Sequence, residues 1–470
     1  MDASEKEIEA ELEEVGPPGM QQVASITSGS IPRAVWGLAW PTLIANVLMT
    51  VTGLINALFV GRLGSGDSIA AIGFAEQILM MVFSIMMSVV VGTTALVARF
   101  TGARDTANAE EAARQSLIMG VVASVIATLV LLAISNPVLQ EMGARGRVLD
   151  LSLAYIRIIC IALVPFSFLI VIGAIFRGLG DTRTPMRIMM GVNALAVLFD
   201  YGLILGHGPF PRLGVVGAAI SSDIVRTAGC IASLYYLLRC PLAGALSGSM
   251  RPSWAWFTRI LSIGIPSALQ ALLRTGGSMA FVYVLGRLPN ANAAVAALTI
   301  GVRTEGISFM PGLAFGAAAT SMVGQNRGAR RSDRAEKAGW VCVRQAISIM
   351  GPMGAVFYLY AGWLARLFTP DPAVIALTAS YLTANAVSQP CMAFGMVLGG
   401  ALQGAGETKV PAWVTFFTMW GIRLPAAYVV ALVLGLGASG AWWTMAASSM
   451  AYALIIASIY KRGKWKAKEV

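Results

Sequence analysis

Long apolar stretches separated by short polar ones recur along the whole 470-residue chain. Cutting the sequence at clusters of Gly, Pro and charged residues leaves twelve apolar segments, each close to the roughly 20 residues that a helix needs to cross a bilayer. They run at about 34–60, 69–97, 112–134, 151–176, 186–206, 214–238, 258–285, 294–323, 340–364, 376–402, 411–434 and 438–460. This pattern predicts an all-α polytopic membrane protein with twelve transmembrane helices.

The overall composition fits a lipid environment. Only 12% of the residues are charged and 57% are hydrophobic, whereas soluble domains carry about 25% charged residues. The five cysteines are scattered without metal-binding or disulfide spacing, and the one histidine, His207, lies in a short loop. The sequence holds no nucleophile–base set, redox motif or phosphate-binding loop, so we expect no enzyme activity, no metal and no cofactor.

Basic residues collect on one predicted side of the membrane. They concentrate in the even-numbered loops and in the C-terminal tail, for example Arg99, Arg104, Arg183, Arg187, Arg251, Arg330, Arg331, Lys461 and Lys464. Cytoplasmic loops of membrane proteins carry such an excess, so we expect both termini and the even-numbered loops in the cytoplasm. The net charge of +11 then reflects this bias, and we expect no nucleic-acid partner.

Several passages of the first half return in the second half. The sequence "FRGLGDTRTP" at 176–185 returns as "LQGAGETKVP" at 402–411, and "TALVARFTGAR" at 94–104 returns as "TSMVGQNRGAR" at 320–330. Chance similarity among apolar helices does not hold its register through loops, so the chain is interpreted as a duplication. Because each half holds an even number of helices, both halves start on the same side. We therefore expect two parallel six-helix repeats, related by an axis along the membrane normal.

The repeat also divides the chain into domains. A Pro- and Gly-rich stretch between the sixth and seventh segments is typical of a linker. The predicted order is an acidic cytoplasmic tail (1–30), an N-lobe (31–240), a cytoplasmic linker (241–257), a C-lobe (258–460) and a basic cytoplasmic tail (461–470).

The doubled passage at 176–185 and 402–411 falls in loops. Its glycines permit a tight turn, and Thr182 and Thr408 are placed to cap the helices that follow. Arg183 and Lys409 can anchor at lipid headgroups. We interpret both copies as hinges and anchors and not as sites of chemistry.

These motifs together resemble the MATE (multidrug and toxic compound extrusion) transporters. "FVGRLG", "ALVARFTGARD" and the doubled loop carry the resemblance, which spans about residues 31–460 and looks closest to the DinF-like bacterial branch. It implies two six-helix lobes that form a V in a bacterial cytoplasmic (inner) membrane. It also implies an antiporter, here taken as a monomer, that exports amphipathic small molecules against an inward flow of H⁺ or Na⁺.

Ionisable residues inside a bilayer are costly, which makes them candidates for function. Asp200 lies deep in the fifth apolar segment, and Asn193 precedes it by two helical turns on the same face. The resemblance implies an acid of a cation or proton site at Asp200; the alternative is a buried Asp that ties helices together. Where the DinF-like pattern has an acid in its first helix, this chain has Asn56, which belongs either to the ion site or to simple interhelical hydrogen bonding.

The C-lobe carries a second set of candidates. Arg274 stands where NorM-like members carry an acid, and Arg303 and Glu305 lie in the eighth segment. Arg274 either faces an anionic substrate and sets selectivity, or bonds a nearby acid such as Glu305.

The leading hypothesis is a secondary active efflux transporter that works by alternating access. A flippase of a lipid-linked saccharide, related in fold, is the alternative, because such proteins carry cationic clefts and Arg274 and Arg423 could line one.

Overall fold

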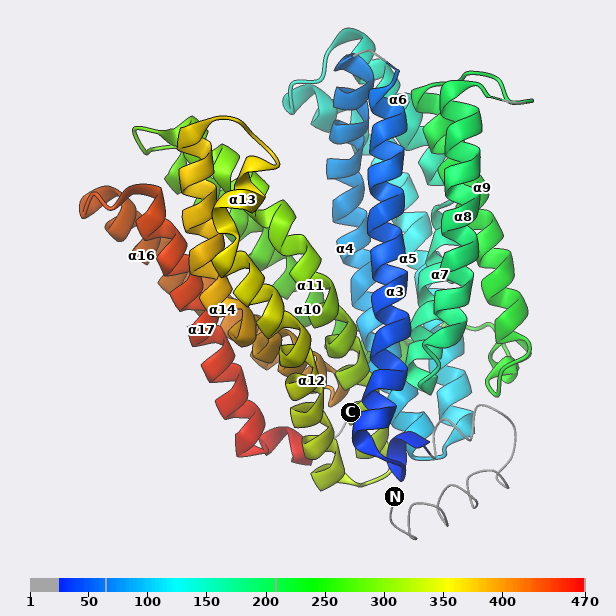
Figure 1. The fold of residues 1–470 in the computed structure, drawn as a ribbon. Helices are drawn as coiled ribbons and strands as arrows, with labels where there is room; N and C mark the ends of the chain where they lie inside the picture. Colours follow the sequence, from blue (N-terminus) through cyan, green and yellow to red (C-terminus); the bar gives the residue numbers. More distant parts are fainter. Residues whose placement is uncertain (1–24, 64–65, 208, 469–470) are drawn as a thin grey trace. The chain divides into compact units, whose positions relative to one another are not determined.

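The computed structural model describes residues 25–63, 66–207 and 209–468 (Figure 1). The regular structure of this described part is helical, as the sequence predicts, and the fold class is confirmed. The predicted acidic tail falls outside the described residues as far as position 24.

The helices that cover the predicted apolar segments occur in the expected order. They are α3 (Ile31–Gly61), α4 (Gly66–Gly102), α5 (Thr106–Glu141), α6 (Gly146–Ile161), α7 (Leu163–Leu179), α8 (Arg183–Leu205), α9 (Val215–Leu237), α10 (Trp254–Leu285), α11 (Ala291–Gly328), α12 (Ser332–Leu359), α14 (Pro372–Gly404), α15 (Lys409–Phe416), α16 (Leu424–Tyr428) and α17 (Gly437–Arg462). Shorter elements are η1 (Ala243–Leu246), α13 (Ala361–Arg366) and η4 (Lys464–Ala467).

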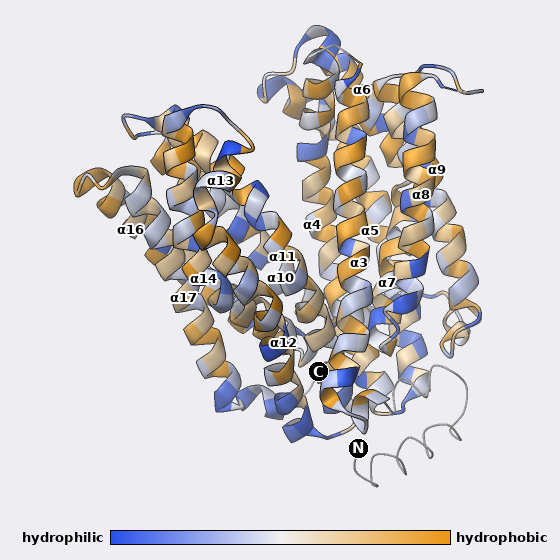
Figure 2. Ribbon diagram, viewed as in Figure 1, coloured by the Kyte–Doolittle hydropathy of each residue, from blue (hydrophilic) through white to orange (hydrophobic). Residues whose placement is uncertain are grey.

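Ten of the described helical spans are long and apolar enough to cross a membrane, and the bent pair α6–α7 makes an eleventh. The helix α14 covers the remaining predicted segment, 376–402. Hydrophobic residues dominate the middle of the helices, and hydrophilic residues gather at their ends and in the loops (Figure 2). The arrangement is that of a polytopic membrane protein with the predicted twelve segments.

The fourth predicted segment is not one straight helix. It breaks at Ala162 into α6 and α7, which meet at 55°. Pro165 explains the break, because proline has no N–H to donate to the carbonyl of Ile161 four positions earlier. The eleventh segment is also irregular: two π-helical stretches, η2 (Phe417–Arg423) and η3 (Val429–Val433), flank α16. Pro425 removes a helical donor just after η2.

The chain divides into two compact units. Unit 1 includes residues 44–264, and unit 2 combines 25–43 with 265–470, so α3 and α10 each contribute to both units. The predicted lobe boundaries, 31–240 and 258–460, remain predictions about domains.

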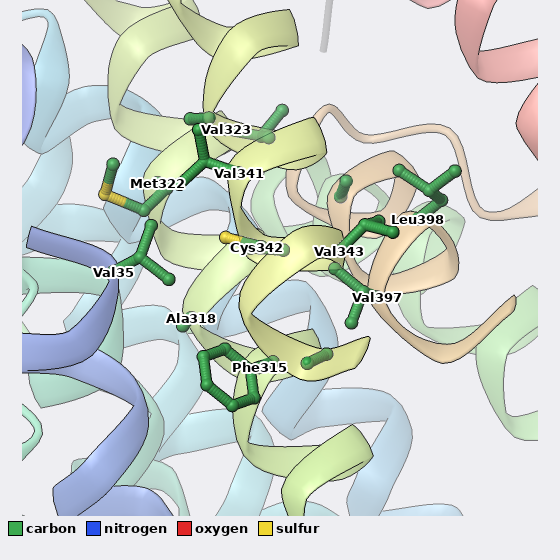
Figure 3. Close-up of a cluster of buried hydrophobic side chains, with 14 of the residues drawn as sticks. Val35, Phe315, Ala318, Met322, Val323, Val341, Cys342, Val343, Val397 and Leu398 are labelled. Carbon is green, nitrogen blue, oxygen red and sulfur yellow. The ribbon is translucent and has the colours of Figure 1, made fainter. Parts of the chain in front are cut away.

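Each unit has its own apolar core. In unit 1, Ile72, Ile156 and Ile204 are buried in one cluster. In unit 2, Val35 of α3 packs with Phe315 and Met322 of α11, Cys342 of α12 and Val397 of α14, as Figure 3 shows. The first turns of α3 are thus part of the core of unit 2.

The repeat seen in the sequence extends to individual hydrogen bonds. The Thr94 hydroxyl of α4 donates to the Ala174 carbonyl of α7 at 3.3 Å in unit 1. Its counterpart in unit 2, the Thr320 hydroxyl of α11, donates to the Gly400 carbonyl of α14 at 2.9 Å. Each unit therefore joins its second and fourth membrane segments by the same contact.

The loops that follow these helices repeat as well. Arg104 and Arg330 both adopt a positive φ, 57° and 58°, which non-glycine residues rarely do. In the doubled passage, Gly180 and Gly406 have φ of 85° and 81°, the left-handed turn that glycine permits. The tight turn predicted at both places is therefore present.

The expected cap of α8 is made by a different residue. Thr182 occupies the N-cap position without a side-chain cap bond. Asp181 instead accepts the backbone N–H groups of Arg183 and Thr184, each at 3.0 Å. Aspartate two positions before the helix reaches both free donors, so the prediction of a threonine cap was wrong by one residue.

The C-terminal tail folds onto unit 2. Trp465 of η4 is buried and stacks on Tyr460, with ring centroids 4.9 Å apart. Lys466 forms ion pairs with Asp333 at 3.0 Å and Glu336 at 2.6 Å, and Lys468 pairs with Glu407 at 2.8 Å. Because the ammonium of Lys466 donates hydrogen bonds to the carboxylates of Glu336 and Asp333, the pKa of Lys466 lies above its usual value. We call residues 463–468 the C-terminal strap.

Candidate functional site

The candidate ion site of unit 1 is built on a carboxylate and an amide from two helices. Asp200 of α8 is 3% exposed. The Nδ2 of Asn56, from α3, donates to its Oδ2 at 2.9 Å. The buried Ser221 of α9 lies near the carboxyl of Asp200. The structure thus brings together two of the three predicted ion-coupling residues.

Asn193 does not join this pair. Its Nδ2 donates to the Met189 carbonyl of its own helix at 2.7 Å. Two helical turns separate it from Asp200 along α8, about 10 Å in rise. Its predicted role in ion coupling remains a prediction, with its amide nitrogen already occupied.

A second group of polar side chains borders Asp200. Tyr155 of α6 is buried and interacts electrostatically with Arg226, Glu76 and Asp200. Arg226 of α9 also interacts with Asp223, and its guanidinium lies 4.8 Å from the centroid of the Phe166 ring. Tyr155 therefore connects the surroundings of Asp200 with those of Arg226 and Glu76 inside unit 1.

Three residues of this group, Tyr155, Asp223 and Arg226, were not predicted from the sequence. The last two stand three positions apart in "AISSDIVRTAGC", an otherwise apolar helix. That spacing places an acid and a base on one helical face, which is a recognisable signal. Tyr155 gives no comparable signal, because only the fold brings α6 beside α9.

The candidate site of unit 2 centres on Glu305 of α11. This carboxyl is 9% exposed and accepts the hydroxyl of the fully buried Tyr381, from α14, at 2.6 Å. Arg274 and Arg423 both interact with it electrostatically. The guanidinium of Arg423, which closes η2, donates to the hydroxyls of Ser448 at 2.7 Å and Ser449 at 2.9 Å.

The two other predicted arginines are exposed. Arg274 of α10 lies over the Phe309 ring at 5.4 Å, and Arg303 of α11 precedes Glu305 by two positions. No ion pair within 4 Å links Arg274 to Glu305 in the described part of the chain. Tyr381 donates a hydrogen bond to Glu305. Arg274 interacts with the carboxyl of Glu305 only electrostatically, over a longer distance.

Neither group of side chains has the form of a transition-metal centre. Within residues 25–63, 66–207 and 209–468, no three His, Cys, Asp or Glu side chains converge. The side chains grouped here are the carboxylate of Asp200, the amide of Asn56, which now turns its nitrogen to Asp200, and the hydroxyl of Ser221. These ligands suit a proton or a hard cation.

Duplicated helical units with ionisable side chains inside their membrane helices are typical of membrane transporters. A family model, MatE, matches residues 41–202 and again residues 266–429. The chain belongs to this family, the MATE transporters. The two matches fall on the two halves of the internal repeat.

Two named relatives of this chain are bacterial proteins. It is 28% identical to a probable multidrug resistance protein NorM of Thermotoga maritima, over 92% of this chain and 93% of that protein. It is also 28% identical to the multidrug resistance protein PmpM of Pseudomonas aeruginosa, over 84% and 83% of the two chains.

Solved structures show the same fold. A MOP superfamily transporter from Pyrococcus furiosus, described as having a binding pocket of reverse polarity, is similar with a TM-score of 0.85 and 25% identity, over 97% of this chain and 100% of that one. A multidrug resistance MATE family transporter in an outward-facing conformation also gives a TM-score of 0.85 at 25% identity, over 97% and 100% of the two chains.

Proposed function

We propose that this protein is a secondary active exporter that moves amphipathic, drug-like compounds out of the cell in exchange for H⁺ or Na⁺. The hydrogen bond between Asn56 and Asp200 carries this proposal. It joins a buried carboxylate to a second helix inside unit 1, so a change in the charge of Asp200 changes a contact between α3 and α8.

A proton would act on this contact directly. Asn56 presents its N–H₂ to Asp200, the orientation that suits a charged carboxylate. A protonated carboxyl is itself a donor and is better matched by the amide oxygen of Asn56. Loading a proton would therefore reorganise the bond between α3 and α8 and shift the balance between two conformations.

A sodium ion would use the same groups in another way. The carboxylate of Asp200, the amide oxygen of Asn56 and the hydroxyl of Ser221 are oxygen ligands. Asn56 would again have to turn its amide, because its nitrogen now faces Asp200. Both ions thus act through the Asn56–Asp200 contact.

The named relatives support both the proposed direction of transport, out of the cell, and the proposed drug-like substrates. NorM and PmpM are named multidrug resistance proteins of bacteria, which fits export of drug-like small molecules across a bacterial cytoplasmic membrane. The arginine bias fits cytoplasmic termini, and each unit has its own core, which fits a transporter that works as a monomer.

Transport in proteoliposomes tests the proposal. We expect export of an aromatic dye, ethidium or fluorescein, when a pH gradient or a Na⁺ gradient is imposed, with one of the two gradients sufficient. Movement that is equally fast without any gradient would contradict secondary active transport.

A flippase of a lipid-linked saccharide is a second candidate. The arginines near Glu305 favour it, because such lipids carry phosphate groups. The reverse polarity described for the Pyrococcus furiosus transporter is a related observation on a protein of the same fold. A lipid-flipping assay in the same proteoliposomes separates this candidate from the exporter.

A further inference from the structure

The charges around Glu305 do not balance. The charged groups that act on Arg423 are the carboxyl of Glu305 and the guanidinium of Arg274. Two arginines therefore share one carboxyl group, and this set keeps a net positive charge. All three residues lie inside helices of membrane length, where an uncompensated charge is costly.

Glu305 is already engaged by its neighbours. Its Oε2 accepts the hydroxyl of Tyr381, and the carboxyl is almost fully buried. Arg423 is held beside it by Ser448 and Ser449. The excess positive charge therefore falls on Arg274.

The surroundings of Arg274 are both open and amphipathic. Its side chain is exposed, and it lies over the ring of Phe309. One helical turn earlier, Gln270 donates to the hydroxyls of Thr415 at 3.0 Å and Tyr452 at 3.2 Å. An exposed guanidinium in the middle of a membrane helix is tolerated where it faces water and not lipid tails.

We propose that Arg274, supported by Arg423, binds the anionic group of an amphipathic substrate, with Phe309 beside its apolar part. The planar guanidinium forms two parallel hydrogen bonds with a carboxylate, phosphate or sulfonate group. This inference rests on the proposed export function and names a substrate class for it. The anion can belong to a soluble organic molecule or to a lipid headgroup.

Two planar dyes of opposite charge test the substrate class. Fluorescein is an aromatic anion and ethidium is an aromatic cation, and the binding of each to the purified protein is followed by fluorescence anisotropy. We expect fluorescein to bind, and Arg274→Gln to weaken it about tenfold or more, the size expected for a hydrogen bond to a charged group. Arg274→Lys keeps the charge without the planar fork and should bind fluorescein with intermediate affinity.

The matched control is Arg344→Gln, another exposed arginine within a membrane helix, α12. It should leave fluorescein binding unchanged. Equal affinity in the wild type, Arg274→Gln and Arg274→Lys would overturn the assignment. If Arg274→Gln does not elute as a single species on size exclusion, the fluorescein affinities of the wild type and Arg274→Lys are compared instead. Equal affinity of these two would then overturn the assignment.

Transport separates this inference from the export function beneath it. If a gradient drives transport of ethidium but fluorescein is neither bound nor transported, the anion site is refuted and the export function stands. Movement of neither dye under any gradient removes the exporter. Adding phosphatidylglycerol to phosphatidylcholine vesicles distinguishes the source of the anion: competition with fluorescein supports a lipid headgroup at Arg274, and its absence supports a soluble anion there.

Discussion

The amide nitrogen of Asn56 lies 2.9 Å from the carboxylate oxygen of Asp200, across 144 positions of sequence. Asn56 cannot exchange a proton, so this pair contains one titratable group where two acids would contain two. Any coupling through the pair depends on Asp200.

Asp200→Asn should uncouple transport. The variant keeps the shape of the side chain and mimics a permanently protonated carboxyl, so we expect it to fold and to bind substrate. Gradient-driven export should fall to the level of empty vesicles. Ethidium transport in proteoliposomes measures this loss.

The control for Asp200→Asn is Glu305→Gln, which neutralises the acid of unit 2. It should have the milder effect on gradient-driven transport. Export by Asp200→Asn at nearly the wild-type rate would make Glu305 the better candidate for coupling.

Arg226 and Asp223 should depend on each other. Removing the base with Arg226→Gln leaves the charge of Asp223 uncompensated among apolar side chains. We expect a loss of stability no larger than the roughly 3–5 kcal/mol typical of fully buried pairs, since both side chains are partly exposed. Thermal unfolding in detergent measures the change.

A double-mutant cycle compares the single variants Arg226→Gln and Asp223→Asn with the variant that carries both changes. The double variant should recover part of the lost stability, because no unpaired charge remains. Strictly additive effects would show that the two side chains act independently.

The C-terminal strap should stabilise unit 2. Trp465→Ala removes a buried ring stacked on Tyr460 and should cost about 3 kcal/mol. Lys464→Ala, at the exposed position next to it, should change little. Thermal unfolding compares the two, and an equal effect would refute a packing role for Trp465.

Cysteine labelling tests the orientation. In a background without the five native cysteines, a thiol at Asp67 or Asn290 should react from outside. A thiol at Arg183 or Lys409, in the two copies of the doubled passage, should react from inside. The reverse pattern would invert the topology that the arginine bias predicts.

The apolar pattern predicted the helices well because bilayer thickness sets their length. The apolar pattern did not predict the break at Ala162, although Pro165 in the sequence could have indicated it. The π-helical stretch that ends at Arg423 was harder to predict, since it depends on how the helix packs around the missing donor of Pro425.

The candidate sites were predicted less completely. Asp200, Asn56 and Glu305 stood out as polar residues in apolar segments, and the structure gives Asp200 and Glu305 their partners. Tyr381 did not stand out, because a tyrosine is common in membrane helices and its contact with Glu305 spans 76 positions. A contact between residues this far apart in the sequence depends on the packing of the helices, so the spacing of residues along the chain does not predict it.

The paired hydrogen bonds of Thr94 and Thr320, and the paired left-handed arginines, Arg104 and Arg330, record a gene duplication in backbone geometry. The two descendants kept this framework while their interiors diverged, one around Asp200 with Asn56 and the other around Glu305 with Arg423 and Arg274. An ancestral homodimer would have carried the same chemistry twice. Fusion into one chain freed each copy to specialise, so that the ion coupling proposed for unit 1 and the substrate binding proposed for unit 2 could evolve under separate selection.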